Sequence, residues 1–184
     1  MRRILLTAAG FENKKIESIF LKMLGKDPQQ AKALWIPTAA IHEEAKAVLP
    51  KCMEDLLNAG MKRENIRVYD LDRVLSYEEL AEYDAVYVCG GDSAYLLGRM
   101  REVQMPERFM RYVEKDGVYV GVSAGSCICS HNFEQGIPWL PCKLRVHCEK
   151  GTPAGRCDFA QEEVISLTNR QAVVFSGDNV EIVE

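Results

Sequence analysis

Residues Gly117-Val-Tyr-Val-Gly-Val-Ser-Ala-Gly-Ser126 decide the fold of this chain. The apolar run up to Val122 predicts a buried strand, and Ser123 follows within a G-x-S-x-G pattern. This pattern predicts a sharp turn at Ser123 and a helix that begins at about Ala124. A serine hydroxyl in such a turn stands clear of the sheet, where the next N–H can stabilise an oxyanion. The alternative is an ordinary strand–turn–helix link with Ser123 as the N-cap.

A second glycine-rich turn occurs earlier in the chain, within Ala85-Val-Tyr-Val-Cys-Gly-Gly-Asp-Ser93. Its apolar residues predict another strand, and the Gly90-Gly91 pair leaves backbone N–H groups exposed for an oxyanion. The alternative is a tight connection to a helix with Asp92 or Ser93 as N-cap. Ligands bind beyond the carboxyl ends of the strands in an open parallel sheet, so we expect both turns to share one site.

Together these motifs resemble the peptidase E family of serine peptidases, which includes aspartyl dipeptidase and the larger cyanophycinase. Gly121-Val-Ser-Ala-Gly125 matches the Gly-x-Ser-Ala-Gly elbow of that family, and Val88-Cys-Gly-Gly-Asp-Ser93 sits where the family has a Gly-Gly-Gly-Asn-Thr type of motif. Ile4-Leu-Leu6 and Trp35-Ile-Pro-Thr-Ala39 resemble its first two strands, so the resemblance covers most of the chain.

The resemblance implies Ser123 as the nucleophile, with the N–H groups of Gly91 and Ala124 as the oxyanion hole. A serine hydroxyl also needs a base. The chain has three histidines, and the family's catalytic histidine corresponds to His147, in Leu144-Arg-Val-His147. His131 follows the elbow helix and should point away from the serine, while His42 should be a solvated residue at the start of a helix.

The third catalytic position departs from the family pattern. Relatives carry an acidic residue after a late strand, where this chain has Asn169. An asparagine can accept the Nδ1–H of an imidazole, but it cannot stabilise the imidazolium as a carboxylate does. Asp158, Glu162 or Glu163 could take that role in space, and the sequence leaves this alternative open.

The substrate implied by the resemblance is a dipeptide or another very short peptide. The family's arginine-bearing segment, which holds an acidic substrate side chain, has no clear counterpart here. Arg156 is the nearest candidate and Arg145 the next, so a preference for N-terminal aspartate is not expected. Asp92, beside the proposed oxyanion turn, is the other candidate substrate-binding residue.

Composition narrows the class of protein. A length of 184 residues fits a single domain over residues 1–184, and the net charge of −4 has no basic patch that would suit nucleic acid. The first apolar run is too short for an export signal or a membrane span. Seven cysteines, an odd number without a C-x-x-C pair, indicate reduced thiols in the cytoplasm rather than a metal site. No cofactor is expected, and both a monomer and a homodimer are compatible with the sequence.

Strands and helices alternate over the first 130 residues, which predicts a three-layer α/β/α fold with a mostly parallel, doubly wound sheet. The layout is that of class I glutamine amidotransferases, which however use cysteine at the elbow. Short antiparallel strands should end the chain. The expected strands are Arg3–Leu6, Ala33–Ile36, Ile66–Tyr69, Ala85–Cys89, the elbow strand, Glu163–Leu167, Ala172–Phe175 and Val180–Val183, and the expected helices Lys14–Leu24, Glu43–Ala59, Ser93–Arg101 and Met105–Lys115.

These observations favour a cytoplasmic serine peptidase in which His147 takes the proton of Ser123 and Ser123 forms an acyl-enzyme. A general α/β-hydrolase esterase fits less well, because that fold places its acid and histidine later on a longer chain. The alternative from another class is a catalytically weak or non-enzymatic binding protein on the same fold, which Asn169 favours.

Overall fold

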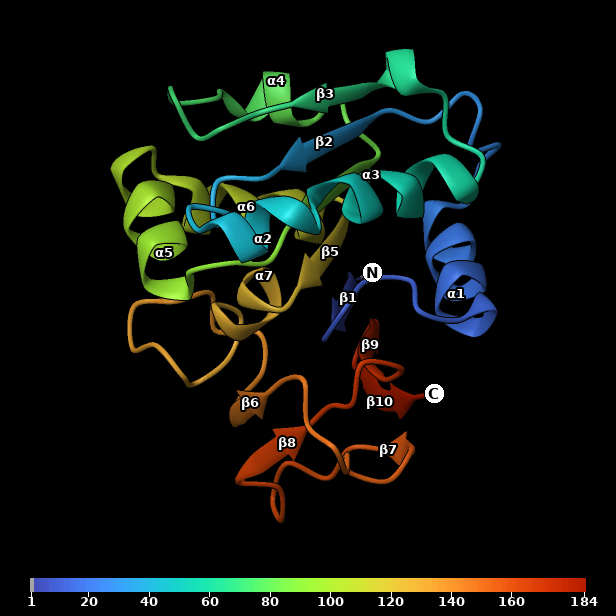
Figure 1. The fold of residues 1–184 in the computed structure, drawn as a ribbon, viewed down its shortest axis with the longest axis vertical. Coiled ribbons are helices and arrows are strands. Elements are labelled where there is room, and N and C mark those ends of the chain that lie inside the picture. The colour runs from blue at the N-terminus through green and yellow to red at the C-terminus, as the bar shows by residue number, and fades with distance from the viewer. Residues whose placement is uncertain (1) are drawn as a thin grey trace.

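The elbow strand β5 (Val118–Val122) lies inside an eight-stranded sheet in the computed structural model, which describes residues 2–184 (Figure 1). The strand order is β3-β2-β4-β5-β1-β9-β10-β7, and β6 and β8 form a separate two-stranded sheet. The other strands are β1 (Arg3–Thr7), β2 (Ala33–Ile36), β3 (Ile66–Val68), β4 (Ala85–Val88), β6 (Lys143–Arg145), β7 (Gly155–Arg156), β8 (Val164–Ser166), β9 (Ala172–Ser176) and β10 (Asn179–Val183).

The parallel half of the main sheet is the one that the alternation of strands and helices predicts. The strands β3, β2, β4, β5 and β1 are parallel neighbours, so their carboxyl ends meet at one edge. The expected antiparallel finish is found in β9, β10 and β7. The prediction is wrong for β8, which pairs in parallel with β6 outside the main sheet, because the two strands satisfy each other's backbone groups there.

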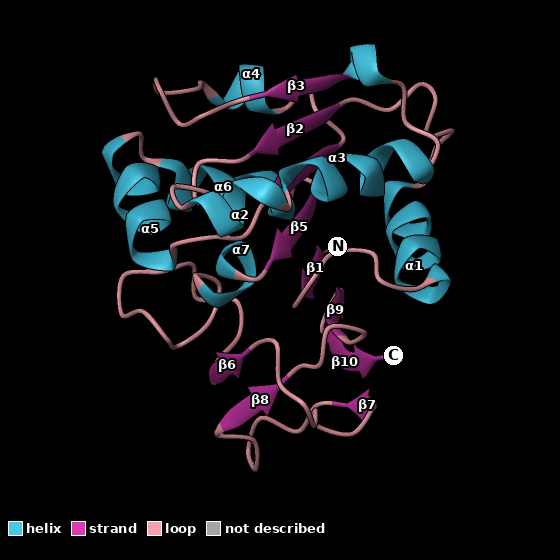
Figure 2. Cartoon of the chain, viewed as in Figure 1, coloured by secondary structure: helices cyan, strands magenta, loops and turns pink. Residues whose placement is uncertain are grey.

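Helices cover both faces of the main sheet, which gives three layers (Figure 2). Alternate residues of a strand point to opposite faces. Leu5 therefore packs with α1 (Lys14–Leu24) and α3 (Leu49–Asn58), while Ile4 and Leu6 pack with α5 (Ser93–Glu102) and α6 (Met105–Glu114). Both faces are apolar, so the strands read as continuous hydrophobic runs.

The segment expected to form one helix over Glu43–Ala59 forms two, α2 (Glu43–Ala47) and α3 (Leu49–Asn58). Pro50 explains the break, since it has no N–H to donate to the preceding turn and its ring crowds that turn. The apolar spacing of the segment predicts that Val48, Leu49, Cys52 and Leu56 are buried. Cys52 and Leu56 are buried, Leu49 is partly buried, and Val48, at the junction of the two helices, is exposed.

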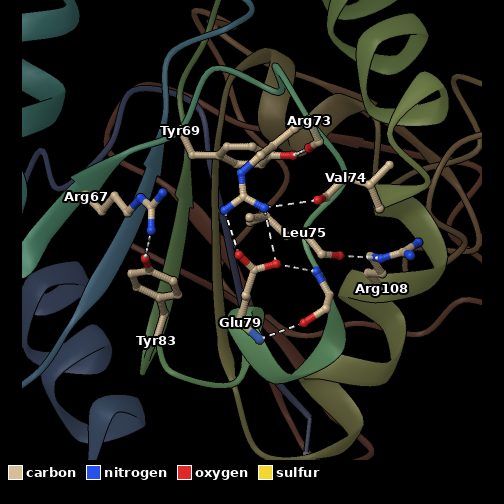
Figure 3. A network of polar contacts seen from close by, with 9 residues as sticks. Arg67, Tyr69, Arg73, Val74, Leu75, Glu79, Tyr83 and Arg108 are labelled. Atoms are coloured by element: carbon tan, nitrogen blue, oxygen red, sulfur yellow. Dashed lines mark hydrogen bonds and ion pairs between the residues drawn. The ribbon is translucent and has the colours of Figure 1, made fainter.

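A short helix, α4 (Tyr77–Leu80), has no counterpart among the expected elements. Ser76 and Glu79 form a capping box at its start, and the Ser76-x-x-Glu79 spacing is the signal that could have revealed it. Figure 3 shows Glu79 also paired with Arg73, with a nitrogen–oxygen distance of 2.6 Å. Arg108 of α6 donates to the Leu75 carbonyl, which ties this connection to the helix layer.

Two further elements complete the described chain, the 3-10 helix η1 (Arg63–Asn65) and the elbow helix α7 (Ala124–Cys127). Within residues 2–184, none of the helices combines the length and apolar character that crossing a bilayer requires.

One carboxylate is buried in the layer of α1 and α3. The Asp55 side chain, 7% exposed, accepts hydrogen bonds on Oδ2 from the Tyr87 hydroxyl at 2.6 Å and from the Phe11 N–H at 2.9 Å. Burial raises the pKa of Asp55 above its ordinary value of 3.8, although these two hydrogen bonds act in the opposite direction.

We predict that Asp55 makes unfolding pH-dependent in the acid range. The folded protein holds the Asp55 proton to a higher pH than the unfolded chain, so this contribution to stability is complete below pH 3.8 and is lost as the pH rises through the raised pKa. Asp55→Asn keeps both hydrogen bonds, because both use one oxygen. In urea unfolding at several pH values, the stability of the wild type relative to Asp55→Asn should therefore fall as the pH rises.

Glu54→Gln, on the exposed side of the same helix, is the control and should follow the wild-type profile. A difference that grows with pH would contradict the prediction.

Candidate active site

The turn at Ser123 has the strained geometry that the sequence predicts. β5 ends at Val122 and α7 begins at Ala124, and Ser123 between them has a φ of 49° and a ψ of −106°. The Ser123 side chain does not cap α7, so the N-cap alternative does not describe it. An outlying conformation at a non-glycine residue persists only where the surroundings enforce it, and such residues cluster at active sites.

The flanking glycines permit a very close approach of chain segments. A Cβ on Gly121 would lie 2.5 Å from the Gly125 carbonyl oxygen, and a Cβ on Gly125 would lie 2.4 Å from that of Val88. Real Cβ atoms do not come so close to backbone, so α7 can pack on β4 and β5 only with glycine at both positions.

Thr7, at the carboxyl end of β1, holds this turn in place. Its carbonyl accepts from the Ser123 N–H at 3.0 Å and from the Ser126 hydroxyl at 2.8 Å. Its own hydroxyl donates to the Gly121 carbonyl at 3.1 Å and accepts from the Gly10 N–H at 2.9 Å. The Thr7 side chain is fully buried, and a threonine at the end of a buried strand belongs to no motif that would mark it in the sequence.

Three side chains of the site form one hydrogen-bonded line. The Ser123 Oγ lies 3.0 Å from the His147 Nε2, and the His147 Nδ1 lies 2.7 Å from the Asn169 Oδ1. Ser123 and His147 thus lie within hydrogen-bonding distance of each other. An amide oxygen only accepts, so the neutral ring carries its proton on Nδ1 and turns the Nε2 lone pair toward the serine hydroxyl.

The small sheet of β6 and β8 brings His147 and Asn169 together. Of its two parallel strands, β6 lies beside α7, and each of the two residues follows the carboxyl end of one strand (Figure 1). The resemblance implies a strand position for His147, but β6 ends at Arg145, and His147 lies two residues beyond it with a φ of 58°. Backbone hydrogen bonds from Leu167 to Arg145 and from Cys148 to Leu167 keep the two chain segments in register on either side of His147.

The Gly90-Gly91 turn lies against Ser123. A Cβ on Gly90 would lie 3.0 Å from the Cβ of Ser123, and one on Gly91 would lie 2.0 Å from the Ala39 carbonyl oxygen. Gly91 also has a φ of 139°, which side-chain-bearing residues rarely adopt. Among the described residues, neither the Gly91 N–H nor the Ala124 N–H donates to a backbone carbonyl, so both can serve an oxyanion.

The remaining candidates lie outside this line. Asp92 is the N-cap of α5, where its Oδ1 accepts from the Tyr95 N–H at 2.8 Å. Arg156 lies on the edge strand β7, four strands from β5 and thus on the order of 19 Å across the sheet. Arg145 lies on β6 and is exposed.

None of the alternative carboxylates takes the place of Asn169 at the imidazole. Asp158 instead accepts from the Ala160 N–H, and Glu162 and Glu163 belong to the same turn region before β8. His131 and His42 are both exposed. His131 lies a few residues after α7, and His42 is the N-cap of α2. The seven cysteines are free thiols, and residues 2–184 contain no group of three side chains suited to holding a metal ion.

Comparison with known proteins agrees with this architecture. The sequence profile of peptidase family S51 matches residues 4–136. An uncharacterized peptidase, PM1590 of Pasteurella multocida (strain Pm70), is 24% identical over 116 residues, which are 63% of this chain. The match covers 56% of that relative, so the chain spans little more than half the length of its curated relative.

Two solved structures share the fold. A Listeria monocytogenes EGD-e protein provisionally assigned to peptidase E has a TM-score of 0.76 and 19% identity, with 100% of this chain and 98% of that chain covered. A peptidase from an acI-B1 Actinobacterium has a TM-score of 0.68 and 16% identity, with 100% and 87% covered.

We predict that the Thr7 hydroxyl is needed for a stable elbow. Thr7→Val keeps the shape but leaves the Gly121 carbonyl and the Gly10 N–H without their partner. An unsatisfied buried polar group costs roughly 1–3 kcal/mol, so urea unfolding should show a loss of about that size. Thr7→Ser restores the hydroxyl and is the control. A Thr7→Val variant as stable as the wild type, or a larger loss in Thr7→Ser than in Thr7→Val, would contradict the prediction.

Proposed function

Since the chain belongs to peptidase family S51, the peptidase E type, we propose that it is a serine peptidase that hydrolyses dipeptides or other very short peptides. The observation that carries the proposal is the line from Ser123 through His147 to Asn169, with distances of 3.0 and 2.7 Å. Both distances lie in the range that direct proton transfer and orientation require.

Acylation begins at the serine hydroxyl. The Ser123 Oγ attacks the carbonyl carbon of the scissile bond while His147 Nε2 takes the hydroxyl proton. The carbonyl oxygen becomes an oxyanion beside the N–H groups of Gly91 and Ala124. The imidazolium then gives its proton to the leaving amine, the C–N bond breaks, and an acyl-enzyme remains on Ser123.

Deacylation repeats these steps with water. His147 removes a proton from a water molecule, which attacks the acyl carbon, and the same two N–H groups hold the second oxyanion. Collapse of this intermediate returns the proton to Ser123 Oγ and releases the acid. The site is open to solvent at His147 and Asn169, which leaves water a direct route to the base.

The proposed substrate class, short peptides, follows from membership of the family. An acidic substrate side chain needs a cation near the site, yet Arg156 lies about four strand spacings from β5, on the order of 19 Å. Arg145 is the nearer of the two candidates, and Asp92 has an oxygen engaged in capping α5. We therefore propose short peptides without a strict demand for N-terminal aspartate.

The second candidate function is a catalytically weak or non-enzymatic binding protein. The specific observation in its favour is that the neutral Asn169 stands where the imidazolium needs a negative charge. Reactivity of Ser123 distinguishes the two functions without knowledge of the substrate.

A fluorophosphonate probe tests the proposal directly. The Ser123 Oγ should form a bond to phosphorus, with fluoride as the leaving group and the hydroxyl proton passed to His147. We expect one labelled peptide in mass spectrometry, the one that contains Ser123, and its loss in Ser123→Ala and His147→Ala. Ser18→Ala, which removes an exposed hydroxyl from α1, is the control and should label like the wild type. A wild-type protein that stays unlabelled would favour the binding protein.

Asn169→Asp should increase the rate. A carboxylate at the Nδ1 side stabilises the imidazolium that forms in both steps, and the reverse change, from Asp to Asn, lowered the rate about ten-thousandfold in a chymotrypsin-type enzyme. We expect a smaller gain here, on the order of tenfold or about 1.4 kcal/mol, because the site is arranged around an amide.

The measurement is kcat/KM on a dipeptide that the wild type hydrolyses. Asp158→Asn is the control and should leave kcat/KM unchanged. A rate that stays equal or falls in Asn169→Asp would show that charge at this position does not limit the reaction.

A further inference from the structure

The residue that orients the imidazole sits in a turn that is itself held by side chains. Asn169 lies within the turn Thr168–Gln171, which the backbone closes with a hydrogen bond from Gln171 to Thr168. The Gln171 side chain, only 3% exposed, accepts from the Thr168 N–H at 3.0 Å and donates to the Thr152 carbonyl at 2.9 Å. The inner side of the turn is therefore fixed from within the fold.

The outer side of the same turn is held by a residue from the other end of the chain. The Asn13 Nδ2 donates to the Arg170 carbonyl at 2.8 Å, one residue after Asn169. The Asn13 Oδ1 meanwhile accepts from the Ile16 N–H at 3.0 Å and so caps α1. One amide group thus joins the start of a helix to the turn that carries Asn169.

Asn13 is a fixed support because the segment before it is anchored in the core. The Gly10 N–H donates to Thr7, and the Phe11 N–H donates to the buried Asp55 carboxylate. The Phe11 ring lies 5.0 Å from that of Phe20, centre to centre. These contacts hold the segment that leads into Asn13.

We propose that Asn13 is a positioning residue of the active site, which acts on His147 through Arg170 and Asn169. The proposal rests on the proposed function, since it names a residue that tunes the same site. Asn169 presents a single neutral oxygen to His147, and the direction of that oxygen follows the orientation of the turn. The Asn13–Arg170 hydrogen bond fixes this orientation, and with it the tautomer that leaves Nε2 free to accept from Ser123.

Two substitutions separate this role from the capping of α1. Asn13→Asp and Asn13→Ser both keep an oxygen for the Ile16 N–H, and Asn, Asp and Ser are about equal as N-caps. Both remove the amide donor to the Arg170 carbonyl, one with and one without a new charge. The melting temperature should therefore change by no more than about 2 °C.

The control breaks the same kind of bond elsewhere. The Asn65 Nδ2 donates to the Gln29 carbonyl at 3.0 Å, before β3 and hence at the opposite edge of the sheet. Asn65→Asp should leave every property of the active site unchanged.

The first readout is the rate of fluorophosphonate labelling at Ser123, which needs no peptide substrate. We expect both Asn13 variants to label on the order of tenfold more slowly, less than the roughly hundredfold loss that a 1 Å misplacement can cause. On a peptide substrate the loss should appear in kcat and leave KM unchanged. Wild-type rates in both variants would overturn the proposal.

The second readout is nitrogen NMR of the His147 ring, which does not depend on activity. The wild type should show mainly the tautomer protonated on Nδ1, and both Asn13 variants should shift toward the one protonated on Nε2. If the wild type fails to label but the tautomer shifts, the proposed function is wrong and the positioning role of Asn13 stands. An unchanged tautomer in both variants rules that role out, whatever the labelling shows.

Discussion

The hydrogen bonds of Thr7 are the constraint on which the rest of the site depends. Its carbonyl and hydroxyl, both inside the sheet, hold the backbone on either side of Ser123 and the loop that follows β1. Ser123 would otherwise relax from a φ of 49°, since such a conformation costs about 1–3 kcal/mol. The buried neighbour strand therefore supports the strained turn, and the glycines at positions 121 and 125 provide the space for it.

Local signals allowed much of the fold to be predicted from the sequence. The bounds of α1 agree with the prediction because its apolar spacing stops at Gly25, which caps the helix with a φ of 67°. β2 ends as predicted because Pro37 follows it. The break at Val48 escaped prediction because the apolar spacing continues across Pro50. The pairing of β6 with β8 also escaped, since each has three residues and the contact joins distant segments.

The residues of the candidate site, too, were only partly predictable from the sequence. Ser123, Gly91 and His147 were recognisable because a motif or a resemblance marks each of them, and the structure brings His147 and the Gly90-Gly91 turn to the serine. The residues that hold the site in place, such as Thr7 and Asn13, belong to no recognisable motif. Asn13 reads in the sequence only as a helix cap, and its bond to Arg170 spans 157 residues. A hydrogen bond between distant segments leaves no local pattern, so the fold had to be known first.

Because Asn169 carries no charge, its side chain must be oriented more strictly than a carboxylate at the same position. A carboxylate attracts an imidazolium by its charge and offers two equivalent oxygens, so some freedom of orientation is tolerable. An amide has one acceptor, and a rotation by half a turn would present a donor to Nδ1 instead. Asn169 is also exposed, so surrounding side chains do not confine it by packing. Its direction must then come from the backbone, and Gln171 on one side and Asn13 on the other supply that constraint. Under the proposed function, the geometry of this turn replaces part of the orienting effect that a negative charge has in a carboxylate triad.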